Sequence, residues 1–151
     1  MESMAKVESR VPDIAMVAAL VLTTCTSVLC VGCENRERNK TLALAALNEL
    51  HQRLASEQYH EAYEAADPEL RQTITEEIFT AQLRTVHERL GTAQSSTVRD
   101  YMSLHRGPRE ILLNLTYDTR FSRGTAVEHV ISRQSNGHSS IVSYEVRSSR
   151  F

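Results

Sequence analysis

The stretch ILLNLTYDTRF at residues 111–121 decides the fold, because its side chains alternate along the chain. The first set, which is mostly apolar, is Ile111, Leu113, Leu115, Tyr117, Thr119 and Phe121; the second, which is mostly polar, is Leu112, Asn114, Thr116, Asp118 and Arg120. A period of two residues is that of a β-strand with one buried face. The first set is therefore predicted to face a core, and Asp118 to face water.

Further strands are predicted on both sides of this one. Residues 122–124 form a turn that leads into a strand over 125–133. Asn136-Gly137 predicts a tight hairpin, because both turn residues must tolerate positive φ. A last strand over 140–147 places Val142, Tyr144 and Val146 at alternate positions. An earlier strand over 94–104 is separated from the opening stretch by Gly107-Pro108, so the strands predict an antiparallel meander.

The residues before this meander have a helical period. Leu44, Leu47, Leu50 and Leu54 recur at steps of three and four after Thr41, which is predicted to be the N-cap. A second helical segment begins near Glu57 and ends at Asp67-Pro68, and this pair is also suited to open a short helical turn.

The last helix is predicted from a capping box and a glycine stop. Thr73-Ile74-Thr75-Glu76 matches the box, and Gly91 is placed as the C-terminal stop. Between them, Phe79, Leu83, Val86 and Leu90 form one apolar stripe. Helices followed by an antiparallel meander predict an α+β domain with the helices packed on one face of a curved sheet.

The composition excludes several functional classes. The 151 residues carry a formal net charge of −2 with both signs interspersed, which gives no electrostatic case for nucleic acid. All three cysteines lie at or before position 33, and Cys30-x-x-Cys33 closes an apolar run instead of opening a helix after a strand. The six histidines show no zinc-ligand spacing. We therefore expect no metal or cofactor.

The leader is an apolar run from Ile14 to Gly32, followed by an abruptly polar segment. We assign residues 1–32 to a signal peptide or membrane anchor, 33–40 to a polar tether and 41–151 to one α+β domain. The sequence Leu29-Cys30-Val31-Gly32-Cys33 resembles a bacterial lipobox, in which Cys33 would carry the lipid. The alternatives are an uncleaved span, for which about 20 apolar residues suffice, and simple cleaved secretion.

The lipobox-like sequence implies a location. A lipid on Cys33 would anchor the chain in a bacterial cell envelope, facing the periplasm or the cell exterior. Glu34, and not Asp, follows the cysteine, which by analogy with enteric bacteria favours the outer membrane.

The order of elements and several motifs resemble the nuclear transport factor 2-like superfamily of cone-shaped, cystatin-like α+β domains, and within it small bacterial lipoproteins of unknown function. The motifs are residues 58–63 (QYHEAY), Ile78-Phe79, Leu90-Gly91, Asn136-Gly137 and residues 143–146 (SYEV), and the resemblance covers about residues 41–148. It implies a conical fold and a homodimer formed through the exposed sheet face. Some members are ketosteroid isomerase-like enzymes with acidic residues in the cone.

Candidates for such acid–base chemistry are Asp118 and Glu128 as carboxylates, with Tyr117 and Tyr144 as proton donors. His129 shares its strand face with Val127 and Ile131, so it is predicted to point into the cone. The competing interpretations are a solvated face for Asp118 and a hydrogen-bonded structural histidine for His129.

The leading hypothesis is a membrane-anchored lipoprotein whose domain binds a ligand or protein without catalysis. The first alternative is a small cone-pocket enzyme with isomerase- or hydratase-like acid–base chemistry, using Asp118 with His129 or Tyr117. The second is a single-span membrane protein whose domain mediates protein contacts. The expected partners are the membrane and an unidentified protein or small molecule.

Overall fold

A computed structural model describes the backbone of residues 14–107 and 110–151, and the side chains of these ranges from Asn35 onward. The chain divides into two compact units, residues 1–37 and residues 38–151. The second unit contains all four strands that the described residues form, together with the core.

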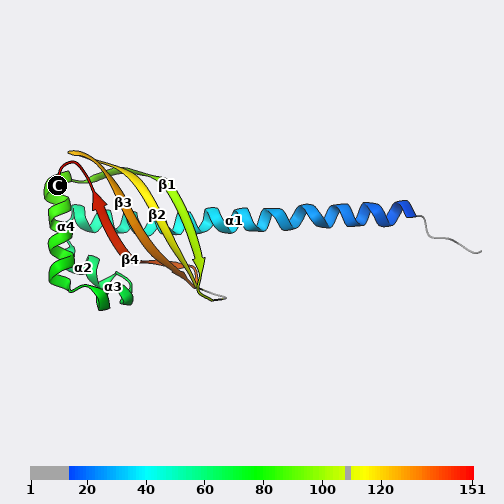
Figure 1. Cartoon of the computed structure of the whole chain (residues 1–151), viewed down its shortest axis with the longest axis horizontal. Helices are drawn as coiled ribbons and strands as arrows, with labels where there is room; N and C mark the ends of the chain where they lie inside the picture. Colours follow the sequence, from blue (N-terminus) through cyan, green and yellow to red (C-terminus); the bar gives the residue numbers. More distant parts are fainter. Residues whose placement is uncertain (1–13, 108–109) are drawn as a thin grey trace, which may run out of the picture. The chain divides into compact units, whose positions relative to one another are not determined.

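The secondary structure is four helices followed by four strands (Figure 1). The helices are α1 (Ile14–Ala55), α2 (Tyr59–Glu64), α3 (Pro68–Thr73) and α4 (Glu76–Leu90). The strands are β1 (Ala93–His105), β2 (Glu110–Phe121), β3 (Gly124–Ser135) and β4 (His138–Arg147), and they form one antiparallel sheet in the order β1-β2-β3-β4. The predicted α+β class and the predicted meander are confirmed.

Helix α1 begins earlier than the sequence predicted. The backbone is helical from Ile14 to Ala55 without a break, so Thr41 is not an N-cap, and the segment 33–40 predicted as a tether is helical as well. Residues 34–40 hold Glu, Arg and Lys and neither Gly nor Pro, so nothing in them interrupts a helix. The side chain of Cys33, and with it the predicted lipid site, lies outside the described residues.

The helix caps explain where the short helices begin and end. Asp67 caps α3 as predicted, because its carboxylate accepts from the backbone N–H of Glu69 at 3.0 Å. The cap of α4 is Thr75 and not Thr73, since the Thr73 hydroxyl donates to the Glu69 carbonyl within α3. Gly91 ends α4 with φ 77°, and a Cβ there would lie 2.1 Å from Ser122 Oγ.

The turn at Asn136-Gly137 joins β3 to β4 with φ of 52° and 79°, as the hairpin prediction requires. In β4, Val142 does not share a buried face with Tyr144, contrary to the predicted alternation. A bulge at Val142 shifts the register, so that Ile141 and Tyr144 are the buried residues.

The core lies between the helices and one face of the sheet. Leu113, Leu115, Tyr117, Thr119 and Phe121 of β2 are buried, as predicted. The helices contribute Leu47, Leu50 and Leu54 of α1 and Phe79, Leu83, Val86 and Leu90 of α4, among others. Residues on this face of the sheet are called the inner face below, and those on the opposite face the outer face.

The prediction for His129 was wrong by one strand position. In β3 the buried residues are Ala126, Glu128, Val130, Ser132 and Gln134. Antiparallel pairing sets Glu128 opposite the buried Tyr117 and His129 opposite Thr116. His129 therefore lies on the outer face, half-buried, with Nδ1 3.2 Å from the Thr116 hydroxyl.

Candidate functional site

The most unusual group of the domain is Glu128, a carboxylate that is 0% exposed in the middle of β3. Its Oε1 lies 2.9 Å from His51 Nε2 of α1 and accepts from the Tyr144 hydroxyl of β4 at 2.6 Å. Its Oε2 accepts from the Thr119 hydroxyl of β2. One helix and the two neighbouring strands thus converge on one buried carboxylate, which is the arrangement that a buried charge requires.

His51 connects this carboxylate to the surface. The imidazole is 7% exposed, and its ring stands edge-on to Phe121, with centroids 5.8 Å apart. It borders an open hollow of about 270 Å³ between α1 and the start of β1, lined also by Asn48, Gln52 and Ser96. Ser96 Oγ in turn lies 2.9 Å from the Thr119 hydroxyl that bonds Glu128.

The electrostatics of this cluster favour an ionised Glu128. Burial alone raises the pKa of Glu128, but the hydrogen bond and charge of His51, with the bonds from Thr119 and Tyr144, outweigh it and hold that pKa below its usual value. Burial and the nearby Glu128 charge raise the pKa of both Tyr117 and Tyr144. Tyr117 differs from Tyr144, because its buried hydroxyl has no hydrogen-bond partner among the described residues.

The candidate residues from the sequence do not form one site. Asp118 lies on the outer face as predicted, where Arg99 binds its carboxylate through Nε at 2.9 Å and through Nη2. His129 is also on the outer face, whereas Tyr117 is on the inner face. The structure instead joins Glu128 and Tyr144, both considered from the sequence, to His51.

Sequence reasoning missed His51, although a signal was present. His51 follows Leu47 by four residues and precedes Leu54 by three, so it shares the apolar stripe of α1. A histidine on such a stripe is buried and needs a polar partner, but its partner is 77 residues away and the helical period cannot identify it.

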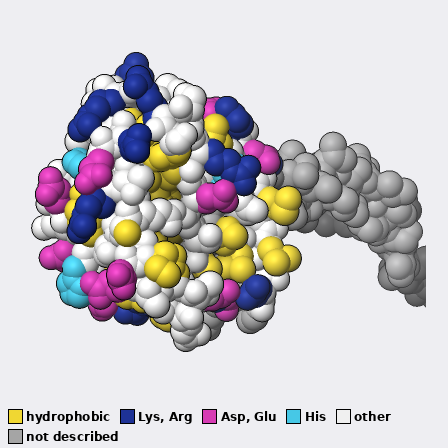
Figure 2. Space-filling model, turned by 60° about the vertical axis from the view of Figure 1, so that its left-hand side comes forward, with side chains coloured by type: hydrophobic (Ala, Val, Ile, Leu, Met, Phe, Trp, Pro, Cys, Tyr) yellow, Lys and Arg dark blue, Asp and Glu magenta, His cyan; other side chains and the backbone are white. Residues whose placement is uncertain are grey.

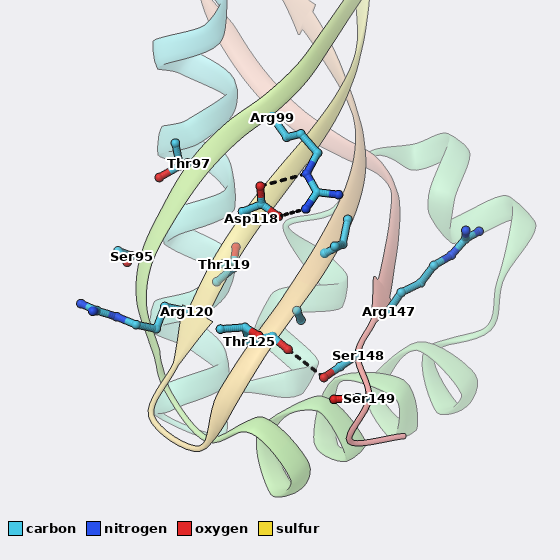
Figure 3. Close-up of a pocket in the computed structure, with 12 residues that line it drawn as sticks. Ser95, Thr97, Arg99, Asp118, Thr119, Arg120, Thr125, Arg147, Ser148 and Ser149 are labelled. Atoms are coloured by element: carbon cyan, nitrogen blue, oxygen red, sulfur yellow. Dashed lines mark hydrogen bonds and ion pairs between the residues drawn. The ribbon is translucent and has the colours of Figure 1, made fainter.

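The outer face carries a hollow of about 580 Å³ that is open to solvent (Figure 3). It lies where β1, β2 and β3 approach the β2–β3 turn and the C-terminal tail. Its charged lining residues are Arg99, Asp118, Arg120 and Arg147; its exposed hydroxyls come from Ser95, Thr97, Thr125 and Ser149, and Ser148 is half-buried beside them. This size is within the usual range for small-molecule sites.

Among the described residues no three His, Cys, Asp or Glu side chains are grouped so that they could hold a metal ion. Within that same part of the chain, no helix is both long enough and apolar enough to cross a membrane.

The chain is thus an α+β domain with a buried Glu128–His51 pair and an open, cationic hollow on its sheet. It belongs to the DUF4019 family, described as a protein of unknown function, whose model matches residues 46–144. The match begins within α1 and ends at Tyr144 of β4, so it includes the whole Glu128 cluster. No curated protein matches the chain.

Proposed function

We propose that this chain is a lipid-anchored binding module of a bacterial cell envelope, with no catalytic role for the domain. The anchor is proposed from the sequence, where a lipobox-like stretch ends at Cys33. The division of the chain between Glu37 and Arg38 is consistent with it, because a unit with its own core begins at Arg38, five residues after Cys33. The proposed location is the cell envelope, with the domain facing the periplasm or the exterior and the outer membrane favoured.

The observation that carries the binding role is the open hollow of about 580 Å³ on the outer face. A general acid or base must reach its substrate. Glu128 is fully enclosed and bonded through both oxygens, and Asp118 is held by Arg99. The accessible polar groups of the hollow suit recognition better than proton transfer.

The anchor is tested by growing cells with labelled palmitate and fractionating them. The wild type should carry the label and sediment with membranes, and Cys33→Ser should lose both properties. Cys25→Ser is the matched control, because it changes a cysteine outside the lipobox-like stretch and should keep the label. An unlabelled wild type would contradict the proposal.

A second candidate function is acid–base catalysis of the isomerase or hydratase type. The observation in its favour is the position of His51. Its Nε2 contacts Glu128, which orients the ring, and the ring borders the hollow of about 270 Å³. The test is deuterium exchange at the carbon next to the carbonyl in a panel of ketones. Exchange by the wild type that His51→Gln abolishes and Asp118→Asn leaves intact would favour the enzyme; equal rates in all three would reject it.

The resemblance to the nuclear transport factor 2-like superfamily adds two finer proposals, a conical fold and a homodimer through the outer face. Met102 and Leu104 support the second, because they are 65% and 58% exposed on strand β1. Sedimentation equilibrium should then give a dimer that Met102→Glu with Leu104→Glu converts to a monomer. A monomeric wild type would reject it.

A further inference from the structure

The charges around the outer hollow are unbalanced. Its lining holds three arginines and one aspartate, a formal charge of +2, whereas the whole chain is at −2. Arg99 and Asp118 neutralise each other through two hydrogen bonds, so the excess resides on Arg120 and Arg147 (Figure 3). Such a local excess of positive charge attracts anions to this part of the surface.

The two remaining guanidinium groups are available to a ligand. Arg120 is exposed and makes no ion pair with any residue of the described ranges. Among the described residues Arg147 pairs only with Glu145, and both side chains of that pair are more than half exposed, so water competes for it. In Figure 3 the side chains of Arg120 and Arg147 lie on opposite borders of the hollow and point away from each other, so each must turn inward to reach a molecule bound between them.

Arg133, at the other end of β3, differs from Arg120 and Arg147 in its partners. Arg133 is bound by three carboxylates, those of Asp67, Glu69 and Glu110, and so has no free face for a ligand. The chain therefore satisfies Arg133 fully with its own acids and leaves Arg120 and Arg147 of the hollow without a strong partner. In Figure 2 the Lys and Arg side chains gather toward the top, which is the end where the C-terminus lies in Figure 1.

The C-terminal tail completes the wall of the hollow. The Ser148 hydroxyl donates to the Thr125 carbonyl at 2.8 Å and accepts from the Arg150 backbone N–H at 3.3 Å. Arg150 packs beside Gly124, where a Cβ would lie 3.4 Å from its Nε. These contacts fix Ser148 and Ser149 beside β3, so hydroxyl donors stand next to the arginines.

We propose that this hollow binds a phosphate monoester, with Arg120 and Arg147 as the charged donors and Ser149 and Thr97 as hydroxyl donors. This deepens the binding role proposed above and rests on it. A dianion matches the charge of +2, and a phosphate group accepts from guanidinium groups in pairs and from several hydroxyls at once. Asp118 does not repel the ligand, because Arg99 neutralises it.

The hollow and the first residue of the domain lie at opposite ends of strand β3. It lies beside the β2–β3 turn, whereas Arg38, the first residue of the domain, has its guanidinium close to Gly137 in the β3–β4 turn. In an antiparallel sheet these two turns stand at opposite ends of β3. The hollow therefore lies at the end of β3 opposite Arg38.

The test is calorimetric titration of the full chain, in neutral detergent, with glycerol 3-phosphate. We expect saturable binding that falls at least tenfold in Arg120→Gln/Arg147→Gln and also weakens in high salt. The matched control is Arg53→Gln/Arg106→Gln, which removes the same charge outside the hollow and should bind as the wild type. No binding by the wild type, or equal weakening in both double variants, overturns the proposal.

A second titration distinguishes the source of the phosphate. Short-chain phosphatidic acid carries the same monoester on a lipid, so tighter binding of it assigns a lipid headgroup, and tighter binding of glycerol 3-phosphate assigns a soluble ligand. Either result supports the site. The palmitate label on Cys33 reads the anchor separately, so a labelled chain that binds neither probe would reject this site while leaving the anchor intact.

Discussion

Glu128 on the inner face of the sheet and Asp118 on the outer face use their carboxylates in opposite ways. Glu128 on the inner face is 0% exposed and is bonded by His51, Tyr144 and Thr119. Asp118 on the outer face is about half exposed and paired with Arg99. Burial makes the contacts of Glu128 strong and any loss costly, whereas water replaces those of Asp118. The Glu128 carboxylate therefore stabilises the fold, whereas the Asp118 carboxylate can exchange its partner for water.

The largest effect should come from removing the inner carboxylate. Glu128→Ala leaves the buried His51, Tyr144 and Thr119 groups without their shared acceptor, so the free energy of unfolding should fall by about 3–5 kcal/mol. Denaturant titration of the full chain in neutral detergent measures it. Asp118→Ala is the matched control and should cost less than about 1 kcal/mol. Equal losses would remove the distinction between the faces.

A pair of tyrosines separates satisfied from unsatisfied groups on the inner face. Tyr144→Phe removes a hydrogen bond to a buried charge and should cost about 1.5–3 kcal/mol of unfolding free energy. Tyr117→Phe removes a buried hydroxyl that has no partner in the described chain, so it should be neutral or stabilising. Denaturant midpoints of the two variants, compared at equal slope, decide between these results.

Should Tyr117→Phe cost as much as Tyr144→Phe, the Tyr117 hydroxyl must have a partner, such as a buried water. The single-atom change keeps the ring packing of both residues, so neither result can be attributed to a cavity.

These residues also mark how far the sequence can predict the molecule. The alternation of residues 111–121 predicted the buried face of β2, and Asn136-Gly137 predicted the hairpin, because both signals are local. The buried face of β3 was predicted wrongly. The apolar Val127 and Ile131 suggested that their face was the buried one, whereas the buried face includes the polar Glu128 and Ser132. A polar residue on a core face contradicts the hydrophobic pattern and is identified only by its partners.

The candidate site was predictable only in part for the same reason. Glu128 and Tyr144 are recognisable as possible acid–base residues, and their strand positions follow from the meander. Their meeting with His51 depends on how α1 packs over the sheet, across 77 residues of sequence. The hollow on the outer face depends on where the C-terminal tail folds back, through Ser148 and Thr125, and no local pattern encodes that contact.

Lowering the pH should also remove the stability that the inner carboxylate, Glu128, contributes. The pKa of Glu128 lies below its ordinary 4.5, so between the two pKa values the unfolded chain binds more protons than the folded one. Stability from this group is therefore complete above about pH 4.5 and is lost as the pH falls through the folded pKa. The groups that face it are His51 from α1, Tyr117 and Thr119 from β2 and Tyr144 from β4.

The measurement is the difference in unfolding free energy between the wild type and Glu128→Gln from pH 7 to pH 3. We expect this difference to be constant near neutral pH and to shrink below about pH 4.5, since protonation then removes from the wild type the charge that the variant lacks. Asp67, whose pKa is also lowered, is unchanged in both proteins, so its contribution cancels. A difference that grows in acid would mean that Glu128 is protonated in the folded state.

The smallest effect should be that of the outer pair itself. A double-mutant cycle with Arg99→Ala and Asp118→Ala should give a coupling of about 0.2–1 kcal/mol in unfolding free energy, because both side chains are about half exposed. The coupling should decrease in 1 M salt, where charges are screened beyond about 3 Å. A coupling well above 1 kcal/mol that salt does not reduce would show that Asp118 is as strongly held as Glu128. The outer pair would then be held as firmly as the inner one.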